Sequence, residues 1–237
     1  MSIRNNRADR GFTLIELLLV VAIIAVLAAI AMPSLLRSKI TANETSAIAT
    51  LRTLYVAQEQ FRSACIVDQN GNGAGEYGFL QELAGDEVPR TRASALRTGE
   101  FVSQTLGATS GGIAAKSGYH FLVYLPNAAD GAIAETDGPA ASVPANAPVQ
   151  EIAWVCYAWP VNRGTSGNRA FVVNQQGLVF VSDNAHPRNY YSGTANVPPA
   201  LSAYAVPARA GLAGPIASTS SMTATDNGNW RPLGGGG

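Results

Sequence analysis

The chain has 237 residues, of which 47% are hydrophobic and 14% are charged, and its formal net charge is zero. This length allows one domain, or at most two, beyond an N-terminal helix. Because there is no excess of basic side chains, no specific nucleic-acid partner is expected.

The N-terminal segment combines a basic leader with a long apolar run. The leader, residues 1–11, carries three arginines and ends in Arg10-Gly11, and the apolar run extends over residues 12–32. Roughly 20 apolar residues match the hydrocarbon core of a bilayer, about 30 Å thick, so this run can cross a membrane. The positive-inside bias predicts a cytoplasmic leader and places the rest of the chain outside the cytoplasm.

Glu16 is the one charged residue inside this apolar run. A charge at membrane depth costs at least about 2.5 kcal/mol, so a retained carboxylate generally has a function and a partner. Cleavage after Gly11 would create an α-ammonium group at Phe12. The Glu16 carboxylate of a neighbouring subunit can neutralise that amine in a medium where neither charge is stable alone. Such a pair would fix the axial stagger between subunits and admit only processed chains.

The block from Gly11 to Glu16 resembles the cleavage and methylation signature of type IV pilins and of the pseudopilins of type II secretion. The resemblance implies that residues 1–11 are a prepilin leader peptide and that Phe12 becomes an N-methylated N-terminus. It also implies that Glu16 is the assembly carboxylate and that residues 12–36 form a transmembrane and assembly helix. The resemblance is close from Arg10 to about Phe61 and fades beyond.

An ordinary secretory signal and a plain signal anchor are the alternative interpretations of this N-terminus. Ala29-Ile30-Ala31 looks like a signal-peptide cleavage site. Neither alternative accounts for Glu16 or for the Gly11-Phe12 boundary. The first residue of the mature chain separates the three interpretations: Phe12 for a pilin, Met32 for a signal peptide, and Met1 or Ser2 for an anchor.

The helical pattern continues through residues 37–66. Pro33 removes one backbone donor, so a helix kink is expected there. Beyond it, apolar residues recur every three or four positions, which is typical of an amphipathic helix that packs against a domain. The apolar positions are Ala47, Ile48, Leu51, Leu54, Tyr55, Phe61 and Cys65, and polar residues on other faces are Asn43, Glu44, Arg52, Glu59 and Arg62.

Residues 67–191 predict a β-rich globular head. Short helical turns are expected at 79–83 and 93–96, and a hairpin turn at Asn174-Gln175-Gln176-Gly177. Runs rich in aromatic and β-branched residues predict four strands, at residues 119–125, 153–159, 169–173 and 178–182.

The expected fold class is α+β, with a long N-terminal helix packed on a small antiparallel sheet, as in type IV pilins. One face of the sheet packs on the helix. The pattern leaves open which face that is, and the candidate residues are Phe121, Val123, Val155, Tyr157, Phe171 or their neighbours.

Two stretches are predicted to be irregular. Residues 127–149, rich in Ala, Pro, Gly and Asp, are typical of a long surface loop, and residues 192–237 form a low-complexity C-terminal tail. Such segments bury too little apolar area to offset the entropy of ordering the chain. In a filament they would line the outer surface.

Two cysteines, Cys65 and Cys156, allow one intramolecular disulfide. The exported compartment permits such a bridge, which would pin the end of the helix to the sheet. A pair of buried free thiols is the alternative.

A loop after the helix is the one candidate ligand site. Asp68, Asn70 and Asn72 precede Gly73 in an order that resembles the first half of an EF-hand loop, and Glu76 follows as a further oxygen ligand. Because these side chains include two carboxylates, they predict at most weak structural calcium. A plain Asn/Gly turn is the alternative, and no other cofactor is expected.

The sequence contains few residues or motifs that would indicate catalysis. Its two histidines, His120 and His186, exclude a metal site with several His ligands. The run Gly73–Gly78 formally matches a dinucleotide-binding fingerprint, but it follows a polar loop instead of a strand. No catalytic residue is assigned, and the chain is not expected to be an enzyme.

The sequence therefore predicts a structural subunit, a pilin, of a type IV pilus-type filament that serves adhesion or motility. The alternatives are a pseudopilin of a type II secretion system and, more remotely, a membrane-anchored periplasmic binding protein or enzyme. The resemblance implies a homopolymer, with a prepilin peptidase, an inner-membrane assembly platform and an assembly ATPase as separate partners. The subunit is expected in the lipid of the bacterial inner membrane before assembly, and afterwards in an extracellular pilus or a periplasmic pseudopilus.

Overall fold

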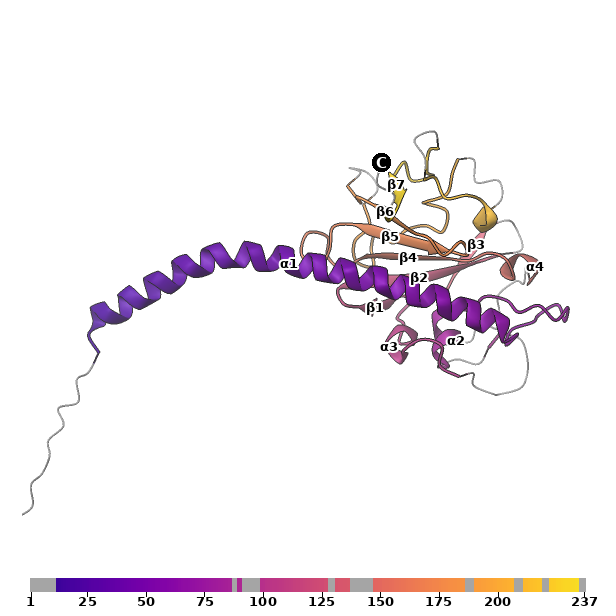
Figure 1. Ribbon diagram of the computed structural model, residues 1–237, viewed down its shortest axis with the longest axis horizontal. Coiled ribbons are helices and arrows are strands. Elements are labelled where there is room, and N and C mark those ends of the chain that lie inside the picture. Colours follow the sequence, from indigo (N-terminus) through magenta and orange to yellow (C-terminus); the bar gives the residue numbers. More distant parts are fainter. Residues whose placement is uncertain are drawn as a thin grey trace, which may run out of the picture. The chain divides into compact units, whose positions relative to one another are not determined.

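A computed structural model describes residues 12–86, 89–90, 99–127, 131–136, 147–185, 190–206, 211–218 and 222–234. The chain divides into two compact units, Met1–Lys39 and Ile40–Gly237. Helix α1 (Leu14–Ser63) begins in the first unit and ends in the second. The predicted fold class is confirmed: the protein is α+β, with a long N-terminal helix and a seven-stranded antiparallel sheet (Figure 1).

Within the second unit, α1 buries one face against the sheet. The buried apolar positions include Leu51, Leu54 and Phe61, which confirms the predicted amphipathic spacing. Two predictions for this helix are wrong. Glu44, expected on a polar face, is buried, and Cys65, expected among the apolar contacts, is exposed because it lies just beyond the last turn.

The sheet has the strand order β1-β2-β4-β5-β6-β7, and all its pairs are antiparallel. β1 pairs with the first half of β2, and β3 pairs with the second half. The strands are β1 (Ala114–Lys116), β2 (Tyr119–Pro126), β3 (Ala132–Ala134), β4 (Val155–Pro160), β5 (Ala170–Asn174), β6 (Val179–Ser182) and β7 (Trp230–Pro232).

The four predicted strands correspond to β2, β4, β5 and β6 and are confirmed. The predicted hairpin turn is confirmed as well, since the Gly177 N–H donates to the Asn174 carbonyl at 2.9 Å. Gly177 has a φ of 74°, and an added Cβ would meet the Tyr55 ring at 2.7 Å, so the turn requires glycine there. The sequence missed β1, β3 and β7, which have three residues each and show no alternation.

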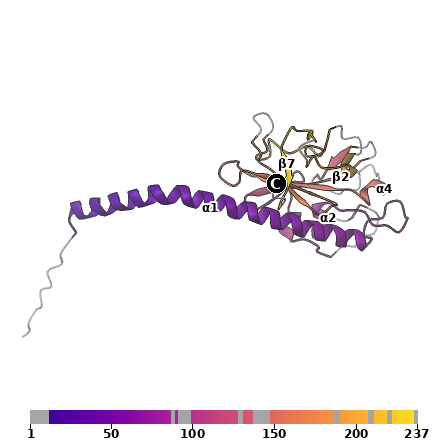
Figure 2. The same cartoon turned by 45° about the horizontal axis from the view of Figure 1, so that its top comes forward.

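Each face of the sheet is covered by a separate core. Phe121, Val123 and Phe171 face α1, whereas Val155 and Tyr157 lie in the core on the opposite face. Of the candidates for the helix-facing side, three are therefore placed there and two are not. In both ribbon views the later part of α1 runs along one side of the sheet, and the C-terminal segments gather on the other (Figure 1, Figure 2).

The prediction that residues 192–237 add no packed structure is wrong for the described part of that segment. Tyr204, Leu212 and Trp230 are buried there, and β7 pairs with β6. Aromatic side chains of the sheet hold this segment by hydrogen bonds to its backbone. The bonds run from Tyr124 Oη to the Pro198 carbonyl (2.6 Å), from Tyr157 Oη to the Ala200 carbonyl (2.9 Å) and from Trp159 Nε1 to the Gly193 carbonyl (2.7 Å).

The remaining elements are short. The helical turn predicted at 79–83 is confirmed as α2 (Leu80–Ala84), whereas the turn predicted at 93–96 lies outside the described residues, as does His186. The loop predicted at 127–149 contains β3 and the start of α4 (Ala147–Gln150), and most of its other positions are not described. Two more turns of helix are α3 (Gln104–Gly107) and η2 (Gly211–Ala213).

A buried ion pair organises the region around α2. The side chains of Arg90 and Glu82 are 0% and 1% exposed, and Arg90 Nε donates to Glu82 Oε1 at 3.0 Å. The guanidinium also donates to Gln150 Oε1 at 2.7 Å and to the Tyr77 carbonyl. Such a buried charge is tolerated because each of its three nitrogens donates to a partner.

Candidate assembly site

The first unit presents an apolar helical surface that nothing in the described chain covers. The large apolar side chains of residues 12–36 are exposed, from 41% at Leu36 to 89% at Phe12. By length and composition, α1 contains a segment able to cross a membrane, and none of that segment is buried. An uncovered surface of this kind needs lipid or other chains around it.

Glu16 lies at the start of this surface and closes the first turn of α1. Its Oε2 accepts hydrogen bonds from the Thr13 N–H at 2.9 Å and from the Thr13 hydroxyl at 2.8 Å, and the Glu16 N–H donates back to Thr13 Oγ1 at 3.3 Å. This reciprocal pair is a capping box, which satisfies N–H groups that the helix leaves without partners. The carboxylate is therefore hydrogen-bonded within its own chain.

Replacing Thr13 with valine is expected to loosen the first turn of α1. Valine keeps the β-branched shape but removes the hydroxyl, and loss of such a cap costs about 1 kcal/mol. We expect the Glu16 amide to exchange its hydrogen about fivefold faster in the detergent-solubilised chain, as that free energy implies. Thr13→Ser retains a hydroxyl and is the matched control. Equal exchange rates in the valine variant and the unmodified chain would contradict the capping role.

The N-terminal part of the chain matches a known sequence motif and is similar to known proteins. Residues 6–32 match the family described as the prokaryotic N-terminal methylation motif. The chain is 41% identical over 92 residues to the type IV major pilin protein PilA of Myxococcus xanthus, covering 39% of this chain and 41% of that protein. Its N-terminal part is thus similar to that of a type IV pilin.

A second curated relative is similar over a comparable length. The chain is 48% identical over 74 residues to the type IV wide pilus major component PilA4 of Thermus thermophilus, covering 31% of this chain and 53% of that protein. The chain thus spans about half, or less, of the length of these relatives. No solved structure matches it.

The residues predicted to take part in processing lie next to the first turn of α1. Phe12 directly precedes the Thr13 cap, and Gly11 lies outside the described residues. Pro33 lies inside α1, which continues through it. Cleavage after Gly11, methylation of Phe12, the kink at Pro33 and the intersubunit pairing of Glu16 stay predictions.

The two cysteines do not form a disulfide. Cys65 is an exposed free thiol just after α1, in the left-handed conformation with a φ of 50°, and its Sγ donates to the Gly73 carbonyl at 3.0 Å. Cys156 is a buried free thiol in the middle of the sheet. The suggested bridge is therefore absent. The alternative of two buried thiols is also wrong for Cys65.

Thiol labelling should distinguish the two cysteines. Burial raises the pKa of Cys156, which keeps this thiol protonated and unreactive, whereas Cys65 is open to solvent. We expect a maleimide to modify Cys65 alone in the folded chain and both thiols after unfolding in guanidinium. Labelling that required prior reduction would show that the thiols pair after all.

The predicted calcium loop is closed by its own hydrogen bonds. Asp68 accepts from the backbone N–H groups of Gly71 at 2.7 Å and Gly73 at 3.0 Å. The carboxamides of Asn70 and Asn72 both donate to Glu151 Oε1, at 2.7 and 2.9 Å. These contacts fit the Asn/Gly turn that was the alternative interpretation of this loop.

Glu76, the fourth predicted ligand, is buried beside the loop. Its Oε1 accepts from the Gln69 N–H at 2.8 Å, and burial raises the pKa of its carboxyl group. Across the described ranges, no three His, Cys, Asp or Glu side chains lie together in a way that could hold a metal ion. Calcium binding here stays a prediction.

Sequence reasoning missed the contact that ties α1 to the head. Glu44 Oε1 accepts from the backbone N–H groups of Asn168 at 3.0 Å and Arg169 at 3.2 Å, and its Oε2 lies 2.6 Å from the Arg169 guanidinium. Glu44 precedes Ala47 and Leu51 by three and seven residues, which places all three on one helical face. That spacing was the signal available in the sequence.

Proposed function

We propose that this chain is a structural subunit of a type IV pilus-type filament, cleaved after Gly11 and assembled through α1. The observation that carries the proposal is the uncovered apolar surface of residues 12–36 with the capped Glu16 at its start. Lipid covers such a surface in the membrane, and neighbouring copies of the same helix can cover it in a filament. The two relatives are named as pilus components, which supports the same role.

The proposal includes a change of location. The precursor is held in the inner membrane by residues 12–36, with the second unit outside the cytoplasm, and the processed chain then enters the filament. A prepilin peptidase, an assembly platform and an assembly ATPase act on the subunit as separate partners. The structural role needs no catalytic residue, and we propose none.

A pilus is favoured over a pseudopilus because both relatives are named as pilus components. A pseudopilin of type II secretion carries the same N-terminal signature, so the N-terminus does not distinguish the two roles. Cells that shed long fibres containing this chain would support the pilus. A secretion defect on deletion, without such fibres, would support the pseudopilus.

The experiment that tests the proposal is determination of the N-terminus in sheared surface material. We expect mass spectrometry to find a chain that begins at Phe12 and carries an added methyl group. Gly11→Val places a branched side chain at the cleavage point, so this variant should retain residues 1–11 and stay in the membrane fraction. Arg10→Lys keeps the leader charge and is the control. Functional filaments that begin at Met1, or a mature chain that begins at Met32, would overturn the proposal.

A further inference from the structure

The sequence contains three Asn-Gly pairs, at residues 70–71, 72–73 and 227–228, and all of them belong to the second unit. Such pairs are chemically labile in water. The glycine nitrogen can attack the carbonyl carbon of the Asn side chain, which closes a succinimide ring. The side-chain nitrogen and the proton of the glycine N–H leave together as ammonia, and water then opens the ring to aspartate or isoaspartate. Glycine favours this reaction because it has no side chain beside the attacking nitrogen.

In each pair, the glycine nitrogen that would attack donates its hydrogen to an aspartate. The Gly71 N–H donates to Asp68 Oδ1 at 2.7 Å, and the Gly73 N–H donates to Asp68 Oδ2 at 3.0 Å. The Gly228 N–H donates to Asp226 Oδ1 at 2.7 Å. The same arrangement therefore occurs three times, in two loops that are far apart in the sequence.

A hydrogen bond of this kind opposes the reaction for two reasons. The nitrogen attacks after it has lost its proton, and the bond exists only while that proton is present, so the bond stabilises the unreactive form. The deprotonated nitrogen would also carry a negative charge beside a carboxylate, and like charges repel. Both effects raise the free energy of the attacking state.

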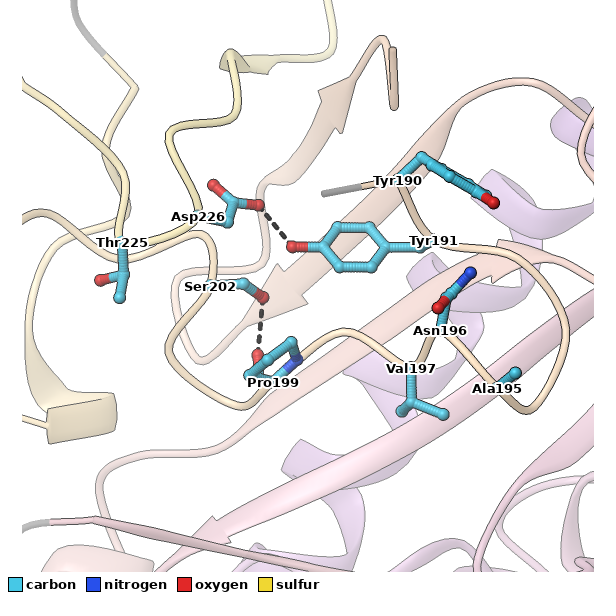
Figure 3. A pocket seen from close by; sticks show the side chains of 9 residues that line it. All are labelled: Tyr190, Tyr191, Ala195, Asn196, Val197, Pro199, Ser202, Thr225 and Asp226. Atoms are coloured by element: carbon cyan, nitrogen blue, oxygen red, sulfur yellow. Dashed lines mark hydrogen bonds between the residues drawn. The ribbon is translucent and has the colours of Figure 1, made fainter. Parts of the chain in front are cut away.

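Both aspartates are fixed acceptors, because other groups hold them in place. Asp226 is 8% exposed, and its Oδ2 accepts from the Tyr191 hydroxyl at 2.6 Å, as Figure 3 shows in the wall of a cavity. Trp230 Nε1 donates to the same oxygen at 3.2 Å. Asp68 accepts a further backbone bond, from the Asn72 N–H to its Oδ1 at 3.2 Å. Each carboxylate is thus held where the glycine N–H meets it.

The backbone explains why labile pairs are present in these loops. Gly71 and Gly73 have φ values of 70° and 84°, a conformation that favours glycine. Asn227 has a φ of 56°, and Asn is one of the few other residues that adopt this conformation readily. Replacing these residues would strain the turns, so protection of the pairs is the alternative.

Conversion of the first two pairs would disrupt the loop that contains them. The carboxamides of Asn70 and Asn72 both donate to Glu151 Oε1, at 2.7 and 2.9 Å, and so tie this loop to the segment before β4. Aspartate at either position would place a second carboxylate against Glu151. A donor would then become an acceptor of like charge, and the tie would be lost.

We infer that Asp68 and Asp226 protect the three Asn-Gly pairs of the folded chain from succinimide formation. Asn70, Asn72 and Asn227 are accordingly the sites at which the chain is modified once this protection is removed. The inference rests on the second unit alone and needs no filament, so its failure leaves the proposed function intact. Failure of assembly likewise leaves this inference intact.

The test is the rate of conversion of each Asn in the full-length, detergent-solubilised chain, followed by peptide mass spectrometry in mildly alkaline buffer. Asp68→Ala removes the acceptor from the first two pairs only. Asn70 and Asn72 should then convert about tenfold faster, the effect of losing a hydrogen bond to a charged group. Asn227 should keep its rate and is the control within the same molecule. Unfolding in guanidinium removes all three bonds, so every pair should then convert faster than in the folded chain.

Three further variants separate the N–H bond from other effects. Glu100→Ala removes an exposed carboxylate that accepts from Gln104 Nε2 at 3.1 Å, and it should leave all three rates unchanged. Glu151→Ala frees the two carboxamides but keeps the bonds to Asp68, so it should accelerate conversion less than Asp68→Ala. Asp68→Asn keeps an acceptor oxygen in the loop and loses only the charge. It should still convert faster than the unmodified chain, and it replaces the alanine variant if a thermal melt shows that alanine unfolds the second unit.

Three results would overturn the inference. The folded and unfolded chains could convert at equal rates, which would mean that the fold protects none of the pairs. Asn70 and Asn72 could convert no faster in both Asp68 variants, and a slower rate would show that Asp68 assists the reaction as a base. Glu151→Ala could accelerate conversion as much as Asp68→Ala, which would assign the protection to the order of the loop and not to the bond at the glycine nitrogen.

Discussion

Glu16→Ala is expected to give a processed, membrane-retained chain that enters filaments poorly. Two opposite charges about 4 Å apart attract by about 4 kcal/mol at an effective dielectric constant of about 20. A factor of ten in an equilibrium corresponds to about 1.4 kcal/mol. Loss of a pair between Glu16 and the α-amine of a neighbouring Phe12 should therefore lower filament yield at least about tenfold.

Glu16→Gln separates the two roles of this side chain. Glutamine retains the oxygen that completes the capping box with Thr13 but carries no charge to neutralise an amine. If the charge pair sets the register between subunits, both variants assemble poorly. If only the cap matters, the glutamine variant assembles normally and Thr13→Val fails with Glu16→Ala.

The measurement is immunoblotting of sheared filaments and membranes, with the N-terminal mass of each fraction. All variants should begin at Phe12, since Glu16 lies beyond the cleavage point. Normal filament yield from Glu16→Ala would remove the proposed role of this carboxylate in assembly.

The features that the sequence predicts well are those with a local cause. The later part of α1 follows from apolar residues at helical spacing, and β2, β4, β5 and β6 follow from aromatic and β-branched runs between turn residues. Glu16 could be singled out because a charge is anomalous in an apolar run. Glu44 shows no such contrast with its polar neighbours, and only its spacing from Ala47 and Leu51 indicates that it lies on the buried face.

The C-terminal segment escaped prediction because its order comes from long-range contacts. Its large residues are scattered, so no period marks them, and by itself the segment would not bury enough apolar area to fold. The outer face of the sheet supplies that area, as the edge-to-face contact between Tyr157 and Trp230, with centroids 6.0 Å apart, shows.

The cysteines show that a disulfide cannot be predicted from the number of cysteines alone. Their number allowed one bridge, but only the placement of each residue decides whether a bridge forms. Cys65 lies exposed after the last turn of α1, whereas Cys156 lies buried in β4, paired across the sheet with Val123 and Val173.

Arg90→Met is expected to lower the stability of the second unit by about 3–5 kcal/mol, the usual cost of removing one partner from a buried ion pair. The Glu82 carboxylate, 1% exposed, would lose the Arg90 side chain 3.0 Å from its Oε1. Gln150 Oε1 and the Tyr77 carbonyl would lose their donors as well. For a unit of roughly 200 residues the expected fall in Tm is about 10 °C, measured by circular dichroism on the detergent-solubilised chain.

Arg231→Met is the matched control, because it makes the same chemical change in an exposed ion pair. Arg231 lies 2.7 Å from Asp183 with side chains 47% and 49% exposed, and such pairs contribute about 0–1 kcal/mol. Its Tm should change by no more than about 3 °C. Arg90→Lys keeps the charge but loses the planar set of donors that reaches Glu82, Gln150 and Tyr77 together. Its Tm should therefore lie between those of Arg90→Met and Arg231→Met. If both methionine variants lowered the Tm equally, burial would not be what makes the Arg90 pair strong.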